Sequence, residues 1–222
     1  MIDLKLKLAF ISCAAYLLSG CNGFSNYPLD KEPIVKIDAS LLGQWKIVGD
    51  IDKDNFITIR KAGQWDGDKK FPAMSANATE DIKKHEHHRY YVTYWNDHGK
   101  NPLYMDRTAF LSQLSGTTFI NLFCRDRPTD SIEIAALKTY GHTTASIEQL
   151  SSAGTKFKDG YCFFKILSVS KTHDSFSVAV VSDPHLKYLK NSTEVKNWVS
   201  KNRNSPGFYS DTIRLYRTKI IR

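Results

Sequence analysis

The sequence predicts a mainly β protein that forms a closed antiparallel barrel, with a C-terminal helix and a last strand that returns to the barrel. Seven or more short apolar runs, rich in aromatic and β-branched residues, follow one another and are separated by turn residues. After residue 183 the apolar residues repeat instead at helical spacing, before one more strand-like run. Sequential antiparallel strands leave two exposed edges unless the sheet closes, so an up-and-down barrel is favoured.

Length and composition agree with one such domain. The chain has 222 residues, of which 41% are hydrophobic, and it carries 31 Lys and Arg against 23 Asp and Glu. This balance excludes global disorder and a coiled coil. The one apolar run typical of a membrane or signal segment stands at the N-terminus, and the later apolar runs are short strand candidates, which excludes a multi-pass membrane protein.

Five strands are expected in the first half of the domain. A long polar connection over residues 62–84 separates the second from the third, and Ser115-Gly116 is typical of a two-residue hairpin between the last two. The five runs lie at residues 45–48, 56–59, 89–95, 103–114 and 117–123.

The second half of the domain begins with another long connection, over residues 125–158. Two strands follow at residues 160–170 and 175–181, joined by a polar turn. Asp183-Pro184 then reads as a helix cap followed by proline at the first helical position. The helical pattern predicts either one helix interrupted near Asn191-Ser192 or two short helices, and the last strand is expected at residues 210–218.

The N-terminus carries a targeting signal. Lys5 and Lys7 precede an apolar run over residues 8–18, whose 11 residues are fewer than the roughly 20 that a membrane-spanning helix needs. The run ends in Leu18-Ser19-Gly20-Cys21, which resembles the lipobox of bacterial lipoproteins. That resemblance implies cleavage before Cys21 and lipidation of its thiol. An ordinary secretory signal with a coincidental cysteine is the alternative.

This signal divides the chain into a signal peptide (residues 1–20), a lipidated flexible tether (21–38) and a barrel domain (39–222). The tether is expected to be flexible because glycine, serine, asparagine and proline are frequent in it. Lipoprotein sorting in enterobacteria-like cells retains proteins with aspartate after the lipidated cysteine in the inner membrane. Asn22 therefore favours the bacterial outer membrane, on its periplasmic face, over the inner membrane.

Two cysteines remain in the domain, Cys124 and Cys162. The bacterial envelope is oxidising, so we expect them to form a disulfide between two strand ends. The alternative is a pair of buried thiols.

Leu42-Gly43-Gln44-Trp45 opens the first strand and resembles the Gly-x-Trp signature of lipocalins and their calycin relatives. The resemblance implies that Trp45 closes the floor of the barrel beneath an arginine of the last strand, either Arg214 or Arg217. The stretches 111–122 and 185–189 are similar to uncharacterised bacterial lipoproteins with a lipocalin-like barrel. Trp45 as a core aromatic of another all-β fold, such as a sandwich, is the alternative.

The sequence gives little indication of a catalytic site or a metal site. His85 and His87 lie two residues apart, and His98 follows after the next strand, but a protein zinc site needs three or four ligands. We expect a solvated polar loop there, and no cofactor. No catalytic motif is present, so an enzyme is not expected. The basic residues are dispersed, which together with the envelope location argues against nucleic acid as a partner.

Two functions remain. Aromatic residues on the strong strands could line an apolar cavity, so the barrel is expected to bind a small apolar molecule or lipid beside its membrane. Alternatively, the core is filled, and the two long polar connections meet an envelope protein partner in immunity, exclusion or envelope assembly.

Overall fold

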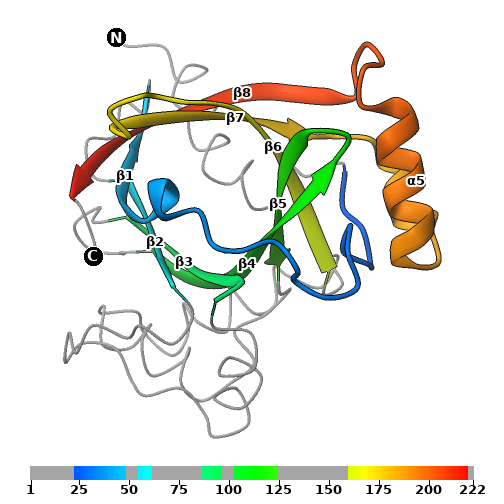
Figure 1. The fold of residues 1–222 in the computed structure, drawn as a ribbon, viewed down its shortest axis with the longest axis horizontal. Helices are drawn as coiled ribbons and strands as arrows, with labels where there is room; N and C mark the ends of the chain where they lie inside the picture. Colours follow the sequence, from blue (N-terminus) through cyan, green and yellow to red (C-terminus); the bar gives the residue numbers. More distant parts are fainter. Residues whose placement is uncertain (1–22, 49–54, 62–86, 97–102, 125–159, 220–222) are drawn as a thin grey trace, which may run out of the picture.

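Eight antiparallel strands close into one barrel in this computed structural model (Figure 1). Each strand pairs with the next along the chain, and β8 pairs with β1 to complete the closure. The expected fold class is therefore confirmed. The structure describes residues 23–48, 55–61, 87–96, 103–124 and 160–219.

The strands lie close to the expected positions. Those of residues 103–114 and 175–181 have the expected bounds, and the others differ by one or two residues at an end. The eight strands are β1 (Gly43–Ile47), β2 (Asn55–Lys61), β3 (Arg89–Asn96), β4 (Leu103–Leu114), β5 (Thr117–Cys124), β6 (Gly160–Val169), β7 (Ser175–Val181) and β8 (Tyr209–Lys219). Ser115 and Gly116 both adopt positive φ, as a tight two-residue turn between β4 and β5 requires.

Two short helices, not one, separate β7 from β8. The 3-10 helix η2 (Pro184–Tyr188) begins after Asp183, whose side chain accepts a hydrogen bond from the His185 amide. Helix α5 (Ser192–Asn202) begins after Asn191, which accepts a hydrogen bond from the Glu194 amide at 2.9 Å. The side chain of Glu194 in turn accepts from the Lys190 amide, so the start of α5 is capped from both directions.

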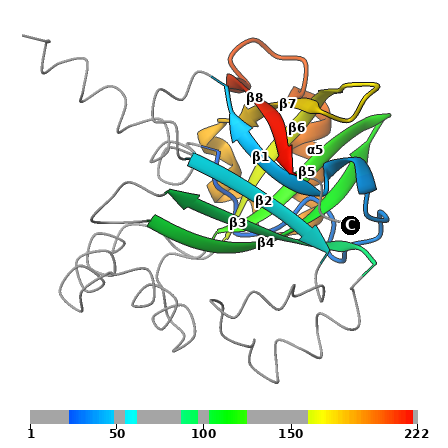
Figure 2. The ribbon, with the colours of Figure 1, turned by 90° about the vertical axis from the view of Figure 1, so that its left-hand side faces the viewer.

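The two ends of the barrel are distinct. A 3-10 helix, η1 (Ala39–Leu41), lies just before β1 at the end that we call the floor. The strands run alternately from the floor to the opposite end, so β1 and β7 finish at that opposite end while β6 and β8 begin there. We call it the open end, because inner-face side chains toward it on β1, β2, β3 and β8 are only partly buried. Figure 2 shows η1 close to the start of β1.

The hydrophobic core consists of two clusters on opposite faces of the sheet. The inner cluster lies inside the barrel and contains Leu41, Leu42, Trp45, Ile59, Tyr90, Ala109, Leu111, Cys162, Phe164, Phe176, Val178, Val180 and Leu215. The outer cluster lies between the helices and the outer face of strands β4, β5, β6 and β7. It contains Leu29, Leu114, Phe119, Phe163, Val181, Leu186, Val195, Val199 and Phe208. Successive strand residues such as Phe163 and Phe164 therefore serve opposite faces.

Residues 23–38, expected to be a flexible tether, are packed against the barrel instead. Ser25 forms an isolated bridge with Tyr161, through backbone hydrogen bonds of 3.0 and 2.7 Å. Leu29 is 1% exposed within the outer cluster, and the carboxylate of Asp30 lies 2.5 Å from the ammonium of Lys196 on α5. Burial of Leu29 removes apolar surface from water, which outweighs the loop-like composition of the segment.

Candidate functional site

Trp45 forms the centre of the floor. Its side chain is fully buried, and its indole Nε1 donates a 3.0 Å hydrogen bond to the Leu41 carbonyl of η1. Phe176 of β7 meets it edge to face, with 4.6 Å between the ring centroids. The indole hydrogen bond and the ring contact together hold η1 and β7 to the start of β1.

Arg217 completes the floor from the last strand. The register of β1 and β8 places it directly opposite Trp45, and its guanidinium carbon lies 4.5 Å from the centre of the indole ring. Its Nη2 also donates a 2.5 Å hydrogen bond to the Ser40 carbonyl. Burial lowers the pKa of Arg217, and the nearby carboxylate of Asp174 acts in the opposite direction. A guanidinium remains protonated in proteins, so the contact is a cation–π interaction.

Arg214, the other arginine considered for this role, lies elsewhere. It pairs with Ser177 of β7, and its side chain is exposed. Its backbone carbonyl accepts a 2.9 Å hydrogen bond from the Val48 amide. Residues three apart on a strand face opposite sides of the sheet, so only one of the two arginines can meet Trp45.

Tyr90 anchors the segment before η1 to β3. Its hydroxyl accepts a hydrogen bond of 2.5 Å from the Asp38 amide and lies 3.3 Å from the Asp38 carbonyl oxygen. Burial raises the pKa of this phenol well above its ordinary value; the Asp38 amide hydrogen bond lowers it, and the negative charge of Asp38 raises it further. Tyr90 therefore stays neutral and acts as a structural link.

The next layer of the interior, toward the open end, is less completely buried. On four neighbouring strands, the residue two positions from a buried floor residue faces the same side and is only partly buried. The buried residues are Trp45, Ile59, Tyr90 and Leu215, at 0–7% exposure, and their partly exposed counterparts are Ile47, Ile57, Val92 and Ile213. The interior thus presents accessible apolar side chains on β1, β2, β3 and β8.

The inner-face side chains of the other strands differ from these in burial or in charge. Val178 and Val180 of β7, and Cys162 of β6, are buried inside. Arg107 shares the inner face of β4 with Ala109 and lies opposite Val92 in the register. A half-buried guanidinium thus lies beside the accessible apolar side chains. Such a combination suits an amphiphile, which has an apolar body and a polar end.

The disulfide expected between Cys124 and Cys162 is not formed. Cys162 is a buried thiol, 2% exposed in the inner cluster, and the side chain of Cys124 lies outside the described part of the chain. The register pairs Cys162 with Leu122, and Cys124 with Gly160. Diagonal neighbours of this kind have Cα atoms roughly 7–8 Å apart, beyond the usual reach of a disulfide.

The other expected sites lie largely outside the described residues. This holds for Cys21 with the whole segment 1–22, for His85 and His98, and for both long connections. His87 is exposed, and its carbonyl accepts a 3.0 Å hydrogen bond from the Ile37 amide. Within the described ranges, no three or more His, Cys, Asp or Glu residues gather as a metal site would require. None of the helices described has the length and apolar character needed to cross a membrane.

A second hollow lies outside the floor. Its volume is about 510 Å³, and it is lined by η1 and by the turn between β6 and β7, with Lys171, His173 and Arg217 among the lining residues. Asp38, which carries the opposite charge, also lines it.

Comparisons with protein-family models, with curated proteins and with solved structures find no match to this chain.

Proposed function

We propose that the protein is a membrane-anchored envelope lipoprotein that binds a small apolar molecule or lipid inside a lipocalin-like barrel. One observation carries the proposal. Ile47, Ile57, Val92 and Ile213 face the interior of a closed barrel and yet remain partly exposed. A ligand that covers them gains about 25 cal/mol for each Å² of apolar surface removed from water.

The lipocalin-like assignment is supported by the floor. A 3-10 helix precedes the first strand, Trp45 follows Gly43 at the start of that strand, and Arg217 of the last strand lies on the indole. These features agree with the Gly-x-Trp resemblance. A fold alone does not determine a function, so the ligand is argued from the interior side chains.

The interior favours one ligand class. Three aliphatic side chains, Ile57, Val92 and Ile213, suit an acyl chain or similar apolar body, and Arg107 suits an acidic end group. A lipid or fatty acid combines the two. Cys21 and Asn22 support the location, since a lipid anchor at the periplasmic face of the outer membrane would hold the barrel beside a source of such molecules.

The proposal is tested by filling the interior. Ile57→Trp places a larger side chain on the inner face of β2, whereas Phe56→Trp places the same side chain one residue away on the outer face. Each variant is titrated with fluorescent fatty-acid and phospholipid probes, and far-ultraviolet circular dichroism verifies the fold. We expect Ile57→Trp to weaken probe binding about tenfold or more, a loss of about 1.4 kcal/mol, and Phe56→Trp to bind as the wild type does.

Two results would contradict the proposal. One is a wild-type protein that shows no saturable probe binding. The other is an Ile57→Trp variant that is folded and binds as tightly as the Phe56→Trp variant. Either result would favour the alternative function, in which the connections over residues 62–84 and 125–158 bind an envelope protein.

A further inference from the structure

The first described residue of the chain lies at the open end of the barrel. Gly23 packs so closely against the last residue of β7 that a Cβ atom at this position would overlap the Val181 carbonyl. Phe24 and Ser25 cover Gly160 at the start of β6, and Ser25 bonds to the Tyr161 backbone. Both strands have these ends at the open end, so the chain enters the barrel there and not at the floor.

The lipidated cysteine would be close to this point. Cys21 precedes Gly23 by two residues. A chain spans at most about 3.6 Å per residue, so the Cα of Cys21 lies within about 7 Å of that of Gly23 whatever conformation the two peptides adopt. Because residues 23–38 are packed on the barrel, a lipidated Cys21 would hold this end of the domain close to the membrane.

The surface around this entry point has the composition of a membrane interface. Asn26 donates a hydrogen bond to the Lys187 carbonyl, which places η2 beside the N-terminal segment. Tyr188 is 66% exposed, Tyr27 is 40% exposed, and the ammonium of Lys187 lies 4.9 Å from the Tyr188 ring. Tyrosine is enriched where proteins meet lipid headgroups, and lysine is attracted to anionic lipids.

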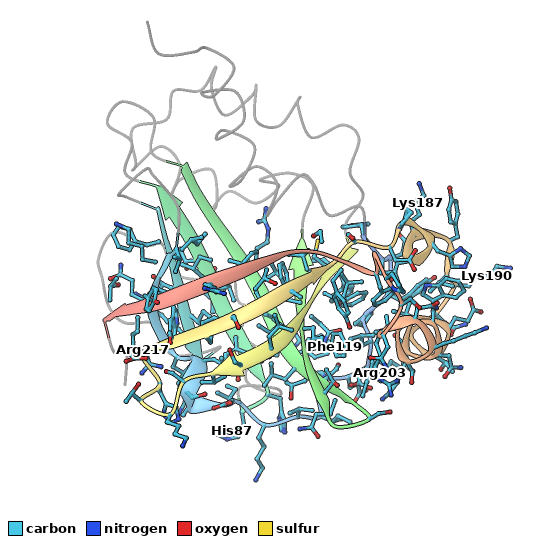
Figure 3. All side chains as sticks on the ribbon, turned by 90° about the horizontal axis from the view of Figure 1, so that it is seen from above. His87, Phe119, Lys187, Lys190, Arg203 and Arg217 are labelled. Atoms are coloured by element: carbon cyan, nitrogen blue, oxygen red, sulfur yellow. The ribbon has the colours of Figure 1, made fainter. Side chains whose placement is uncertain are left out.

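The exposed charged side chains that η2 and the residue pair after it contribute to this surface include two lysines. Lys187 and Lys190 are both exposed, and Figure 3 shows them on the side of the molecule opposite Arg217. Two carboxylates close to these lysines in the sequence are engaged within the protein. Asp183 accepts hydrogen bonds from the His185 amide and from the Trp198 indole, and Glu194 accepts from the Lys190 amide.

We infer that the open end of the barrel faces the membrane, with η2 and the N-terminal segment resting on anionic lipid headgroups. The inference rests on the proposed lipidation of Cys21, and it names the source of the proposed ligand, which is the leaflet that holds the anchor. A lipid could then enter the interior without crossing the aqueous space. The floor, with Trp45 and Arg217, points away from the membrane.

The orientation is tested on the full-length, lipidated protein in vesicles of phosphatidylethanolamine and phosphatidylglycerol that contain a headgroup nitroxide lipid. A fluorophore is attached either at the open end, through Tyr188→Cys, or at the floor, through Lys171→Cys in the exposed turn after β6. Both variants carry Cys124→Ser, and the buried Cys162 is protected from labelling. The strands separate these ends well, since the 11 residues of β8 span roughly 35 Å.

We expect the label at position 188 to lose most of its emission and the label at position 171 to retain most of it. Lys187→Glu combined with Lys190→Glu should reduce the quenching at position 188, while the protein stays with the vesicles through its acyl chains. Stronger quenching at position 171, or equal quenching at both positions, would overturn the inference and leave the proposed ligand binding intact.

Failure of the proposed function gives different results. A protein that does not stay with the vesicles, or whose N-terminal peptide lacks the acyl mass, contradicts the anchorage and the inferred orientation together. Cys21→Ala provides the reference for that outcome, because it has no thiol to acylate. The expected quenching pattern without saturable binding of any lipid probe would support the orientation and contradict the ligand.

Discussion

The two hydrophobic clusters of this protein differ in how completely they are closed. In the outer cluster, every core residue is between 0 and 4% exposed, and it draws on strands, on α5 and on the N-terminal segment. The inner cluster is as well buried at the floor, but its side chains toward the open end of β1, β2, β3 and β8 are partly exposed.

This difference separates the regions that stabilise the fold from the region that we propose binds a ligand. The outer cluster and the floor contain the fully buried aromatic side chains, including Trp45, Phe119 and Phe163. Such residues contribute most to the free energy of unfolding. The partly exposed layer contributes less, so the ligand that we propose would displace water there without disturbing the parts that hold the barrel together. The predictions below test this division.

Trp45→Ala should have the largest effect. The side chain is fully buried, so its loss leaves a cavity at the floor and should lower the free energy of unfolding by about 3–5 kcal/mol. Chemical denaturation measures the change. Tyr188→Ala is the control, because an exposed aromatic should alter stability by no more than about 0.5 kcal/mol. A Trp45→Ala protein as stable as this control would show that the floor is not part of the structural core.

Asn121→Ala should weaken the attachment of the N-terminal segment to the outer cluster. The buried Asn121 amide accepts from the Leu29 amide at 2.8 Å and donates to the Ser112 hydroxyl and the Phe110 carbonyl. Leaving such buried partners unsatisfied costs about 1–3 kcal/mol. Hydrogen exchange of the Leu29 amide and chemical denaturation report the loss. Gln113→Ala, at an exposed position near the end of β4, is the control, and equal stability of the two variants would contradict the expectation.

Arg217→Met should have a moderate effect on the inner cluster. Methionine retains much of the side-chain packing but removes the cation–π contact with Trp45, which is worth about 0.5–2 kcal/mol, together with the hydrogen bond to the Ser40 carbonyl. Arg214→Met removes the same charge from an exposed position of the same strand and should have little effect. Thermal and chemical unfolding of the two variants measure how much more stability is lost at position 217 than at position 214. Equal losses in both variants would mean that only net charge matters.

Tyr90→Phe should have the smallest effect near neutral pH, about 0.5–1.5 kcal/mol for the lost hydroxyl contacts. The effect that distinguishes this variant from the wild type is expected at alkaline pH. Burial raises the pKa of Tyr90 above the value of 10.0 that it has when unfolded, so the stabilising effect is complete below pH 10 and declines as the pH rises further. The variant should lose less stability above pH 10 than the wild type does.

Denaturation midpoints at increasing pH test this expectation. Tyr209, whose pKa burial raises to about 12, contributes to the alkaline decline in both proteins and does not obscure the comparison. An identical decline in the wild type and in Tyr90→Phe would show that Tyr90 ionises without opposing the fold.

The strands could be predicted because their signal is local. Alternating apolar residues and the Ser115-Gly116 turn specify β4 and β5 within a few neighbours, and the Asp183-Pro184 cap likewise marks the start of η2. The floor was expected on different grounds, from the resemblance that Gly43 and Trp45 carry. The sequence did not decide which arginine of the last strand meets Trp45. The choice between Arg214 and Arg217 depends on the register of β8 against β1.

The remaining errors also arise from contacts between distant segments. The N-terminal segment has the composition of a linker, and its one strong apolar signal, Leu29 with Phe24 nearby, is too short to show periodicity. Its packing depends on Asn121, 92 residues away. The disulfide between Cys124 and Cys162 failed because cysteine count and compartment do not specify register.

The closing pair of strands also bears on how the chain is made. Trp45 lies opposite Arg217, so the contact that seals the sheet joins residues 172 positions apart (217 − 45). While the chain is being synthesised, β1 and β7 remain unpaired edges until β8 emerges, and such edges recruit other strands. A nascent chain that stops before residue 209 therefore has neither a sealed sheet nor a finished floor. Translation must reach its last strand before this protein is protected from aggregation.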